Sequence, residues 1–195
     1  MENEVKEPAP KYNYISPEEY LEMERAAEFR NEYYHGQILA KSGASLRHNR
    51  IDGNIISIIG TYLKGKNCQI LPSHMRVSTP SHDSYMYPDA SIICGAPMLE
   101  DEKFDTLLNP AVIFEILSPS THNIDKGRKF FFYQQIPSLN EYTMIDSLKR
   151  FIHIARKKSD QSWVVETINE DATEIYITAI GLSLSLDDIY EGTGL

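Results

Sequence analysis

The sequence contains little cysteine and no long apolar run. Cys68 and Cys94 are the only cysteines in 195 residues, and they lack the C-x-x-C spacing typical of metal and redox motifs. The most apolar stretch, Ile55 to Ile59, is interrupted by Ser57 and falls far short of the roughly 20 apolar residues that cross a bilayer. We therefore expect no membrane segment, and we expect both cysteines to stay reduced, as small hydrophobic side chains, in the cytoplasm.

The N-terminus lacks the apolar segment of a signal peptide. Residues 1–10, MENEVKEPAP, are charged, and Pro8 and Pro10 would interrupt any helix. We interpret residues 1–12 as a flexible leader. The remaining length suits one domain, so we expect residues 13–195 to fold as a single unit.

The chain also lacks the positive charge typical of proteins that bind nucleic acids non-specifically. Its formal net charge is -9, whereas such proteins are usually basic. A nuclease is not excluded, because carboxylates can hold a divalent metal while a local basic surface guides the phosphate backbone. The one concentrated basic stretch, residues 149–158, fits either a solvated hairpin or an edge that faces nucleic acid.

The N-terminal half of the sequence predicts two helices and a hairpin. The segment Ser-Pro-Glu-Glu at 16–19 matches a capping box, which predicts a helix up to about Arg30. Short strands at 32–34 and 37–40 flank a His-Gly turn, as in a β-hairpin. Apolar residues at helical spacing predict a second helix at about 45–63.

Beyond residue 68 the pattern changes to strands with one further helix. The continuous apolar run at 111–117 predicts a central strand covered on both faces, and a helix follows at about 124–136. Segments 80–88 and 97–109 are predicted loops, and 185–190 is predicted to be one helical turn. The pattern indicates an α/β (α+β) fold with a mixed central sheet flanked by helices and with C-terminal antiparallel strands. The other predicted strands are 68–71, 75–78, 89–94, 141–145, 151–155, 163–167 and 174–177.

Glu115 is the first candidate for chemistry. It interrupts the apolar run at 111–117, where an unpaired ionised group costs several kcal/mol. It therefore needs a cation as its partner, which is a metal ion, a lysine or an arginine. A structural ion pair and a metal site both satisfy this need.

Asp89 supplies a second carboxylate, directly after Pro88 at the start of a predicted strand. Alone, an aspartate in this position is also typical of a turn. Together with Glu115 on a neighbouring strand it makes a pair that suits Mg²⁺. Magnesium takes few carboxylates and completes its shell with waters and phosphate oxygens.

Lys129 lies four residues from both Asp125 and Tyr133, so the three residues share one face of the predicted helix. From that face its ammonium group can point at a metal-bound water or a phosphate oxygen. The plain alternative is a surface ion pair between Asp125 and Lys129, worth a few tenths of a kcal/mol.

Six segments carry a family resemblance. The most specific is Glu-Ile-Leu-Ser-Pro-Ser-Thr at 115–121, and together they cover most of residues 14–147. Through them the chain resembles the Uma family of restriction endonucleases, a prokaryotic group within the PD-(D/E)xK nuclease superfamily. The other segments are 16–21, 32–36, 42–45 leading to His48, 87–89, and 125–133.

The resemblance implies a restriction-endonuclease-like core and a metal-dependent phosphodiesterase site that uses Mg²⁺ or Mn²⁺. It assigns the family's two metal-binding acids to Asp89 and Glu115, with the backbone carbonyl of Ile116 as a third ligand. The usual lysine would fall two residues after the second acid, where this sequence has Leu117. Members of the superfamily can carry that lysine on the following helix, where Lys129 is the matching candidate.

Further residues are expected to support this site. His48, in the preceding helix, is either a metal contact or an ordinary polar helix residue. Glu32 is expected in a similar role. Tyr133 and Gln135 would orient the substrate or the lysine, and Lys126 is the second choice for the lysine itself.

The sequence thus predicts a metal-dependent endonuclease that hydrolyses DNA phosphodiester bonds, with a metal-bound water assisted by Lys129. DNA as the substrate follows from the resemblance alone. A homodimer is expected, because restriction-type folds often dimerise to cut two strands. The alternative is a catalytically weak or inactive nuclease-fold module that binds DNA or a protein, which Leu117 and the net charge of -9 both fit.

Overall fold

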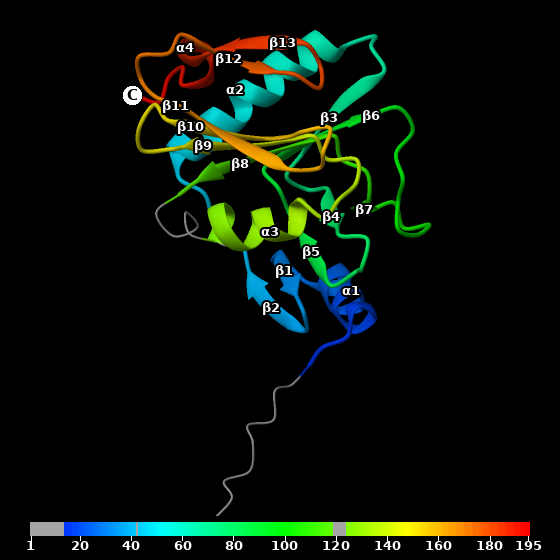
Figure 1. The fold of residues 1–195 in the computed structure, drawn as a ribbon. Helices are drawn as coiled ribbons and strands as arrows, with labels where there is room; N and C mark the ends of the chain where they lie inside the picture. The colour runs from blue at the N-terminus through cyan, green and yellow to red at the C-terminus, as the bar shows by residue number, and fades with distance from the viewer. Residues whose placement is uncertain (1–13, 42, 119–123) are drawn as a thin grey trace, which may run out of the picture.

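A mixed six-stranded sheet forms the centre of the structure (Figure 1). Its strands are β3 (Cys68–Pro72), β6 (Ala90–Cys94), β8 (Val112–Leu117), β9 (Glu141–Asp146), β10 (Ile152–Lys157) and β11 (Trp163–Ile168). They run in the order β11-β10-β9-β8-β6-β3, with β8 and β9 parallel and the other neighbours antiparallel. This computed structural model describes residues 14–41, 43–118 and 124–195, and the leader predicted at 1–12 lies outside them.

A second sheet of five short strands contains the N-terminal hairpin. Its strands are β1 (Asn31–Tyr34), β2 (Gln37–Ala40), β4 (Arg76–Ser78), β5 (Ser84–Met86) and β7 (Thr106–Leu107), in the order β2-β1-β5-β4-β7. β5 and β7 fall inside segments 80–88 and 97–109, so the prediction of plain loops there is wrong. These strands have only three and two residues, which is too short for a periodic pattern. They form because they are buried and pair with neighbours distant in the sequence.

The helices begin where the sequence predicts them. The Ser16 hydroxyl accepts the N–H of Glu19 at 3.2 Å, and the Glu19 carboxylate accepts the N–H of Ser16 at 2.8 Å, so the capping box is confirmed. Ser45 caps the second helix. Within the described ranges, no helix has the length and apolar character of a membrane span. The helices are α1 (Pro17–Ala26), α2 (Leu46–Leu63) and α4 (Leu186–Ile189), and α4 follows a small sheet of β12 (Glu174–Ile177) and β13 (Leu182–Ser185).

Apolar side chains cover both faces of the central sheet, as the apolar run of β8 predicts. On one face, α2, α4 and the small β12–β13 sheet pack over Phe114 and Ile116 (Figure 1). On the other face, the helix after β8 and part of the five-stranded sheet pack over Ile113 and Leu117. Successive strand residues point to opposite faces. Glu115 therefore points to the same face as Ile113 and Leu117.

The hairpin of β1 and β2 turns at His35 and Gly36, which both have positive φ angles, 45° and 85°. Turns of this kind match the twist of the flanking strands and favour glycine. A Cβ atom on Gly36 would also lie 2.3 Å from the ring of Tyr14. The predicted hairpin is confirmed, and its glycine is required both by conformation and by space.

The helix predicted at 124–136 is shorter and irregular. A π-helix, η1 (Ile124–Lys129), runs directly into α3 (Phe130–Tyr133), and a proline follows soon after, which no helix can continue through. A π-helix closes hydrogen bonds between residues five apart, so the four-residue spacing assumed for Asp125 and Lys129 does not apply. The side chain of Asp125 lies outside the described residues.

Cys68 and Cys94 form a disulfide between β3 and β6. The prediction that both cysteines stay reduced is therefore wrong for this structure. Cys68 is the first residue of β3 and Cys94 is the last residue of β6. The antiparallel register places them directly opposite each other. Their separation of 26 residues along the chain gives no sign of this contact.

Candidate active site

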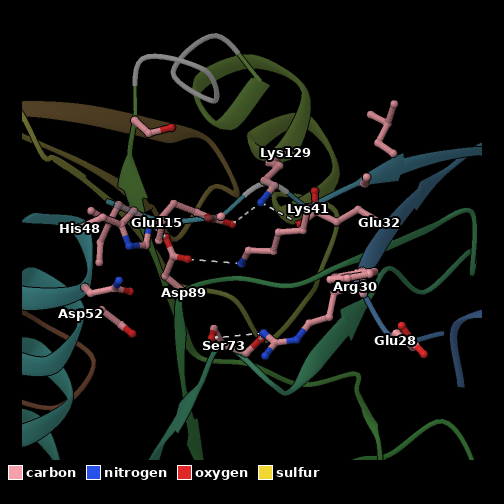
Figure 2. A pocket seen from close by; sticks show the side chains of 18 residues that line it. Glu28, Arg30, Glu32, Lys41, His48, Asp52, Ser73, Asp89, Glu115 and Lys129 are labelled. Carbon is pink, nitrogen blue, oxygen red and sulfur yellow. Dashed lines mark hydrogen bonds and ion pairs between the residues drawn. The ribbon is translucent and has the colours of Figure 1, made fainter. Parts of the chain in front are cut away.

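A cavity of about 740 Å³ opens beside the carboxyl end of β8. Its walls come from the α1–β1 loop, the β2–α2 loop, the first turns of α2, the start of β6, and η1 (Figure 2). The ionisable residues that line it are Glu28, Arg30, Glu32, Lys41, His48, Asp52, Asp89, Glu115 and Lys129. Segments far apart in the sequence therefore bring acidic and basic groups to one hollow.

Glu115 is 2% exposed and lies at the inner wall of this cavity. Its Oε1 atom accepts a hydrogen bond from the Nζ of Lys129 at 3.0 Å and another from the hydroxyl of Tyr133 at 3.0 Å. Lys129, at the end of η1, points toward Glu115 in Figure 2, and Tyr133 follows at the end of α3. The cation that a carboxylate needs in this strand is thus supplied, at least in part, by Lys129.

Lys129 joins two carboxylates. Its Nζ lies 2.9 Å from Oε1 of Glu32 and 3.0 Å from Oε1 of Glu115, and the residue is 4% exposed. Burial alone would lower the pKa of Lys129, but the charges of Glu115 and Glu32 outweigh it and hold the pKa well above its usual value. The ammonium group is therefore a permanent hydrogen-bond donor at neutral pH and cannot accept a proton.

Glu32 connects this cluster to the five-stranded sheet. Burial opposes its ionised form, yet the charge and hydrogen bond of Lys129, with the charge of Lys41, lower its pKa. Its Oε1 also accepts the backbone N–H of Tyr87 at 3.0 Å, and its Oε2 accepts the hydroxyl of Tyr34 at 2.8 Å. These bonds fix the Glu32 carboxylate and, through it, the position of Lys129.

Asp89 lies across the cavity from Lys129, directly before β6. Its Oδ2 accepts the backbone N–H of Ile116 at 2.7 Å and lies 3.2 Å from Nε2 of His48. Its Oδ1 lies 3.3 Å from Nζ of Lys41, which also donates to the carbonyl of Tyr87 at 2.6 Å. Burial opposes ionisation, but His48, Lys41 and the Ile116 amide together hold the pKa of Asp89 well below its usual range.

The backbone of Ile116 contributes a carbonyl to the same corner. In a strand, the N–H and C=O of one residue point to the same side, because paired residues exchange both bonds with one neighbour. The N–H of Ile116 reaches Asp89, and the β6–β8 ladder ends at Ala90 and Phe114. The Ile116 carbonyl is therefore directed toward the Asp89 side and is not used in that ladder.

Two buried polar atoms near Asp89 have no hydrogen-bond partner among the described residues: Nδ1 of His48 and Oδ1 of Asp52. Burial and the nearby charge of Asp89 raise the pKa of Asp52 to about 6. Unsatisfied buried polar atoms are rare in folded proteins and are often explained by a bound ion or water. Both atoms are therefore available to hydrogen-bond a polar ligand in this corner.

The donor set of this corner suits a hard divalent cation. Asp89, Glu115 and the carbonyl of Ile116 offer the oxygen atoms that Mg²⁺ and Mn²⁺ prefer. No three His, Cys, Asp or Glu side chains enclose a metal by themselves in the part of the chain that the structure describes. Magnesium tolerates such an open site, because waters and substrate phosphates complete its shell.

The structure brings most of the sequence-predicted residues together, but not all of them. Five of them line the cavity: Glu32, His48, Asp89, Glu115 and Lys129. Tyr133 does not line it but donates a hydrogen bond to Glu115. Gln135 does not reach the cavity: it is exposed, and its amide donates to the carbonyl of Phe131. Leu117 is buried in the apolar core against the segment after β8, which explains how a leucine replaces the usual lysine there. The side chain of Lys126 lies outside the described residues.

Sequence reasoning missed several lining residues. Lys41, which contacts Asp89, stands in a loop, where a lone lysine carries no pattern. Asp52 stands one helical turn after His48, and this spacing of four residues on α2 could have indicated it. Tyr34 does not line the cavity, but its hydroxyl donates to Glu32, and the sequence indicates Tyr34 only as part of a strand. The basic stretch at 149–158 lies apart from the cavity, and its Arg150 and Arg156 pair with carboxylates, as expected for a solvated hairpin.

The fold is shared with a solved nuclease-like structure. A crystal structure from Anabaena variabilis, described as "a putative nuclease belonging to DUF820", superimposes with a TM-score of 0.77 at 20% sequence identity. The match covers 92% of this chain and 99% of that chain. The predicted fold class, a restriction-endonuclease-like α/β core with a mixed sheet, is thereby confirmed.

The sequence comparisons place the chain among cyanobacterial relatives and in one family. Two Synechocystis proteins, slr1290 and sll1609, both called uncharacterized, are each 32% identical to it. The first match covers 95% of this chain and 96% of the relative, and the second covers 83% and 91%. The family model Uma2, described as "Putative restriction endonuclease", matches residues 17–187. The chain therefore belongs to the Uma2 family, whose description supports a nuclease.

Proposed function

We propose that this protein is a metal-dependent endonuclease that hydrolyses phosphodiester bonds of DNA. The observation that supports this most strongly is the convergence of Asp89, Glu115 and Lys129 from two strands and a helix on one cavity. The family description and the nuclease-like fold favour the same reaction class. DNA as the substrate is our inference from the family description.

In this proposal Asp89, Glu115 and the Ile116 carbonyl hold one Mg²⁺ or Mn²⁺. When bound, such an ion lowers the pKa of a water ligand and polarises the scissile phosphate. His48 donates to Asp89 in the structure, which suits it to orient that carboxylate. We propose direct contact with the metal as a second role of His48, to be tested together with its orientation of Asp89.

Lys129 acts as a fixed positive charge in this proposal. Because two carboxylates keep it protonated, its positive charge holds the attacking water and offsets the negative charge that develops on the phosphate. Glu32 and Tyr133 hold the ammonium group and the Glu115 carboxylate in place. A proton released by the water must therefore leave through solvent or the phosphate, and not through Lys129.

A second candidate function is a nuclease-fold module that binds DNA or a protein without cutting. The observation that favours it is that both acids are paired with protein cations, Asp89 with Lys41 and Glu115 with Lys129. A metal ion would have to compete with these ammonium groups. Metal titration separates the two functions, because a neutralised site should bind Mg²⁺ or Mn²⁺ weakly.

The test is cleavage of supercoiled and single-stranded DNA with Mg²⁺, with Mn²⁺ and with EDTA. We expect metal-dependent cutting by the parent protein and a loss of at least about a hundred-fold in Glu115→Gln, which removes a ligand charge but little volume. Glu141→Gln is the matched control, because Glu141 is equally buried and paired with Arg156, away from the cavity. Cutting by Glu115→Gln at the parent rate would refute the proposal.

The oligomeric state also belongs to this proposal. Cutting both strands of a duplex with one active site per chain favours a homodimer. Light scattering coupled to gel filtration, with and without duplex DNA, measures it. A monomer in both conditions would remove the homodimer from the proposal and leave the chemistry of the site unchanged.

A further inference from the structure

Arg30 differs from the other cations of the cavity. Lys41 and Lys129 each lie within 3.3 Å of a carboxylate oxygen. Arg30, in contrast, makes no ion pair with any carboxylate in the described part of the chain. Its Nη1 donates to the carbonyl of Ser73 at 2.7 Å, and its guanidinium lies 5.7 Å from the ring centre of Tyr87.

These contacts hold the guanidinium in place without an ion pair to any carboxylate among the described residues. A guanidinium carries five N–H donors in a planar fork, and the bonds to Ser73 use only Nη1. Its Nε and Nη2 make no hydrogen bond to the protein groups that the structure describes. Figure 2 shows Arg30 reaching into the cavity below Lys41, while the carboxylate of Glu28 points away from it. A half-buried arginine with free donors facing a cavity suits a bidentate phosphate contact.

The neighbouring residue favours a nucleotide as the source of that phosphate. Phe29 lines the same cavity and is 78% exposed. An exposed aromatic ring beside a guanidinium is the combination that binds bases and phosphates of nucleic-acid strands. Free inorganic phosphate would need no such ring.

We infer that Arg30 forms a second phosphate subsite, which binds a backbone phosphate next to the scissile one, with Phe29 against the adjoining base. This inference rests on the proposed nuclease function and deepens it. It defines the substrate as a polynucleotide strand that contacts the cavity at two phosphates, and it makes Arg30 a substrate-positioning residue.

The experiment measures binding apart from cleavage. A short fluorescein-labelled oligonucleotide, single-stranded or as a duplex, is titrated in Ca²⁺ at several salt concentrations. Removing one phosphate contact should weaken binding roughly ten-fold and lower the slope of log K against log salt by about 0.7 for a single strand or 0.9 for a duplex. We expect this of Arg30→Gln. Arg30→Lys loses the guanidinium fork but keeps the positive charge. It should therefore keep most of the slope of log K against log salt.

The matched control is Arg150→Gln. Arg150 is also a partly exposed arginine, but it pairs with Asp187 and does not line the cavity. It should change neither affinity nor slope. Thermal melting of each variant shows whether the fold is retained.

A second measurement removes the charge from the oligonucleotide instead of from the protein. An oligonucleotide series that carries one neutral methylphosphonate at each position in turn should show a loss of affinity at the position that Arg30 contacts. In Arg30→Gln, this loss should disappear, because the contact is already gone.

The outcomes separate this inference from the nuclease proposal. An Arg30-dependent slope without metal-dependent cutting would support the subsite and refute the nuclease. Cutting by the parent with an unchanged slope in a folded Arg30→Gln would overturn the subsite alone. A second outcome would also overturn the subsite, namely a parent protein that binds neither the single-stranded nor the duplex oligonucleotide.

Discussion

A single ammonium group, that of Lys129, pairs with two buried carboxylates, Glu115 and Glu32. Breaking a buried ion pair by removing one partner is strongly destabilising, because the remaining charge stays buried without its partner. Lys129 is therefore important for stability as well as for the proposed chemistry. The two roles have to be separated by experiment.

We expect Lys129→Met to lower the free energy of unfolding by about 3–5 kcal/mol, measured by urea denaturation at pH 7. Lys149→Met, an exposed lysine, is the control and should stay within about 0.5 kcal/mol of the parent. Adding Glu32→Gln to Lys129→Met should recover part of the stability, because one buried charge is removed, but it should not recover cleavage. If Lys129→Met is as stable as the parent, the buried cluster does not carry the charges assigned to it.

At the scale of elements, the disulfide joins β3, which is the edge strand of the central sheet, to β6. Asp89 lies directly before β6. Closing a loop of 26 residues should stabilise the fold by roughly 3–4 kcal/mol in the chain-entropy description. We expect the double variant Cys68→Ala with Cys94→Ala to unfold at correspondingly lower urea concentration. The parent treated with dithiothreitol should approach the double variant. Equal stability of oxidised and reduced parent would contradict this expectation.

Long elements were predictable because each has its own periodic or compositional signal. The capping box at 16–19, the helical spacing of α2 and the apolar run of β8 all agree with the structure. The short strands β5 and β7 were not predictable, because each pairs with a strand distant in the sequence, β1 and β4 respectively. The same reason hid the contact between Cys68 and Cys94.

The candidate site shows the same division. Asp89, Glu115 and Lys129 could be chosen from the sequence because they stand at the start of a strand, inside an apolar strand and on the following helix. Lys41 and Arg30 could not be chosen, because they come from loops. They reach the cavity only because the five-stranded sheet packs on the central sheet. Loop residues that converge in space leave no regular spacing in the sequence.

At the scale of the whole molecule, α1 is held to the rest of the protein by a charged cluster. Arg25 on α1 lies 2.8 Å from Oδ2 of Asp105, whose Oδ1 lies 2.8 Å from Nη2 of the buried Arg76. Arg25 also reaches Asp101 at 2.7 Å. The cluster therefore connects α1, segment 97–109 and β4.

This cluster predicts an acid-sensitive contribution to stability. The hydrogen bond from Arg25 and the charge of Arg76 outweigh partial burial and lower the pKa of Asp105 from 3.8 to about 2. Because the folded pKa lies below the unfolded value, the contribution is complete above pH 4 and is lost as the pH falls toward 2. Unfolding free energies measured from pH 6 to pH 2 should fall less steeply in Asp105→Asn than in the parent. Identical pH profiles would show that the cluster contributes nothing.

The hydrogen bond from the Ile116 amide to Asp89 has a further consequence for the whole molecule. It ties one acid to the backbone of the strand that carries the other, so the separation of the two is limited by the pairing of β6 with β8 and not by side-chain rotation. The paired strands of the central sheet, which are the stiffest part of the protein, therefore limit how far the two acids can move apart. Sequence changes in the surrounding loops can alter what the cavity accepts without altering the spacing of its acids.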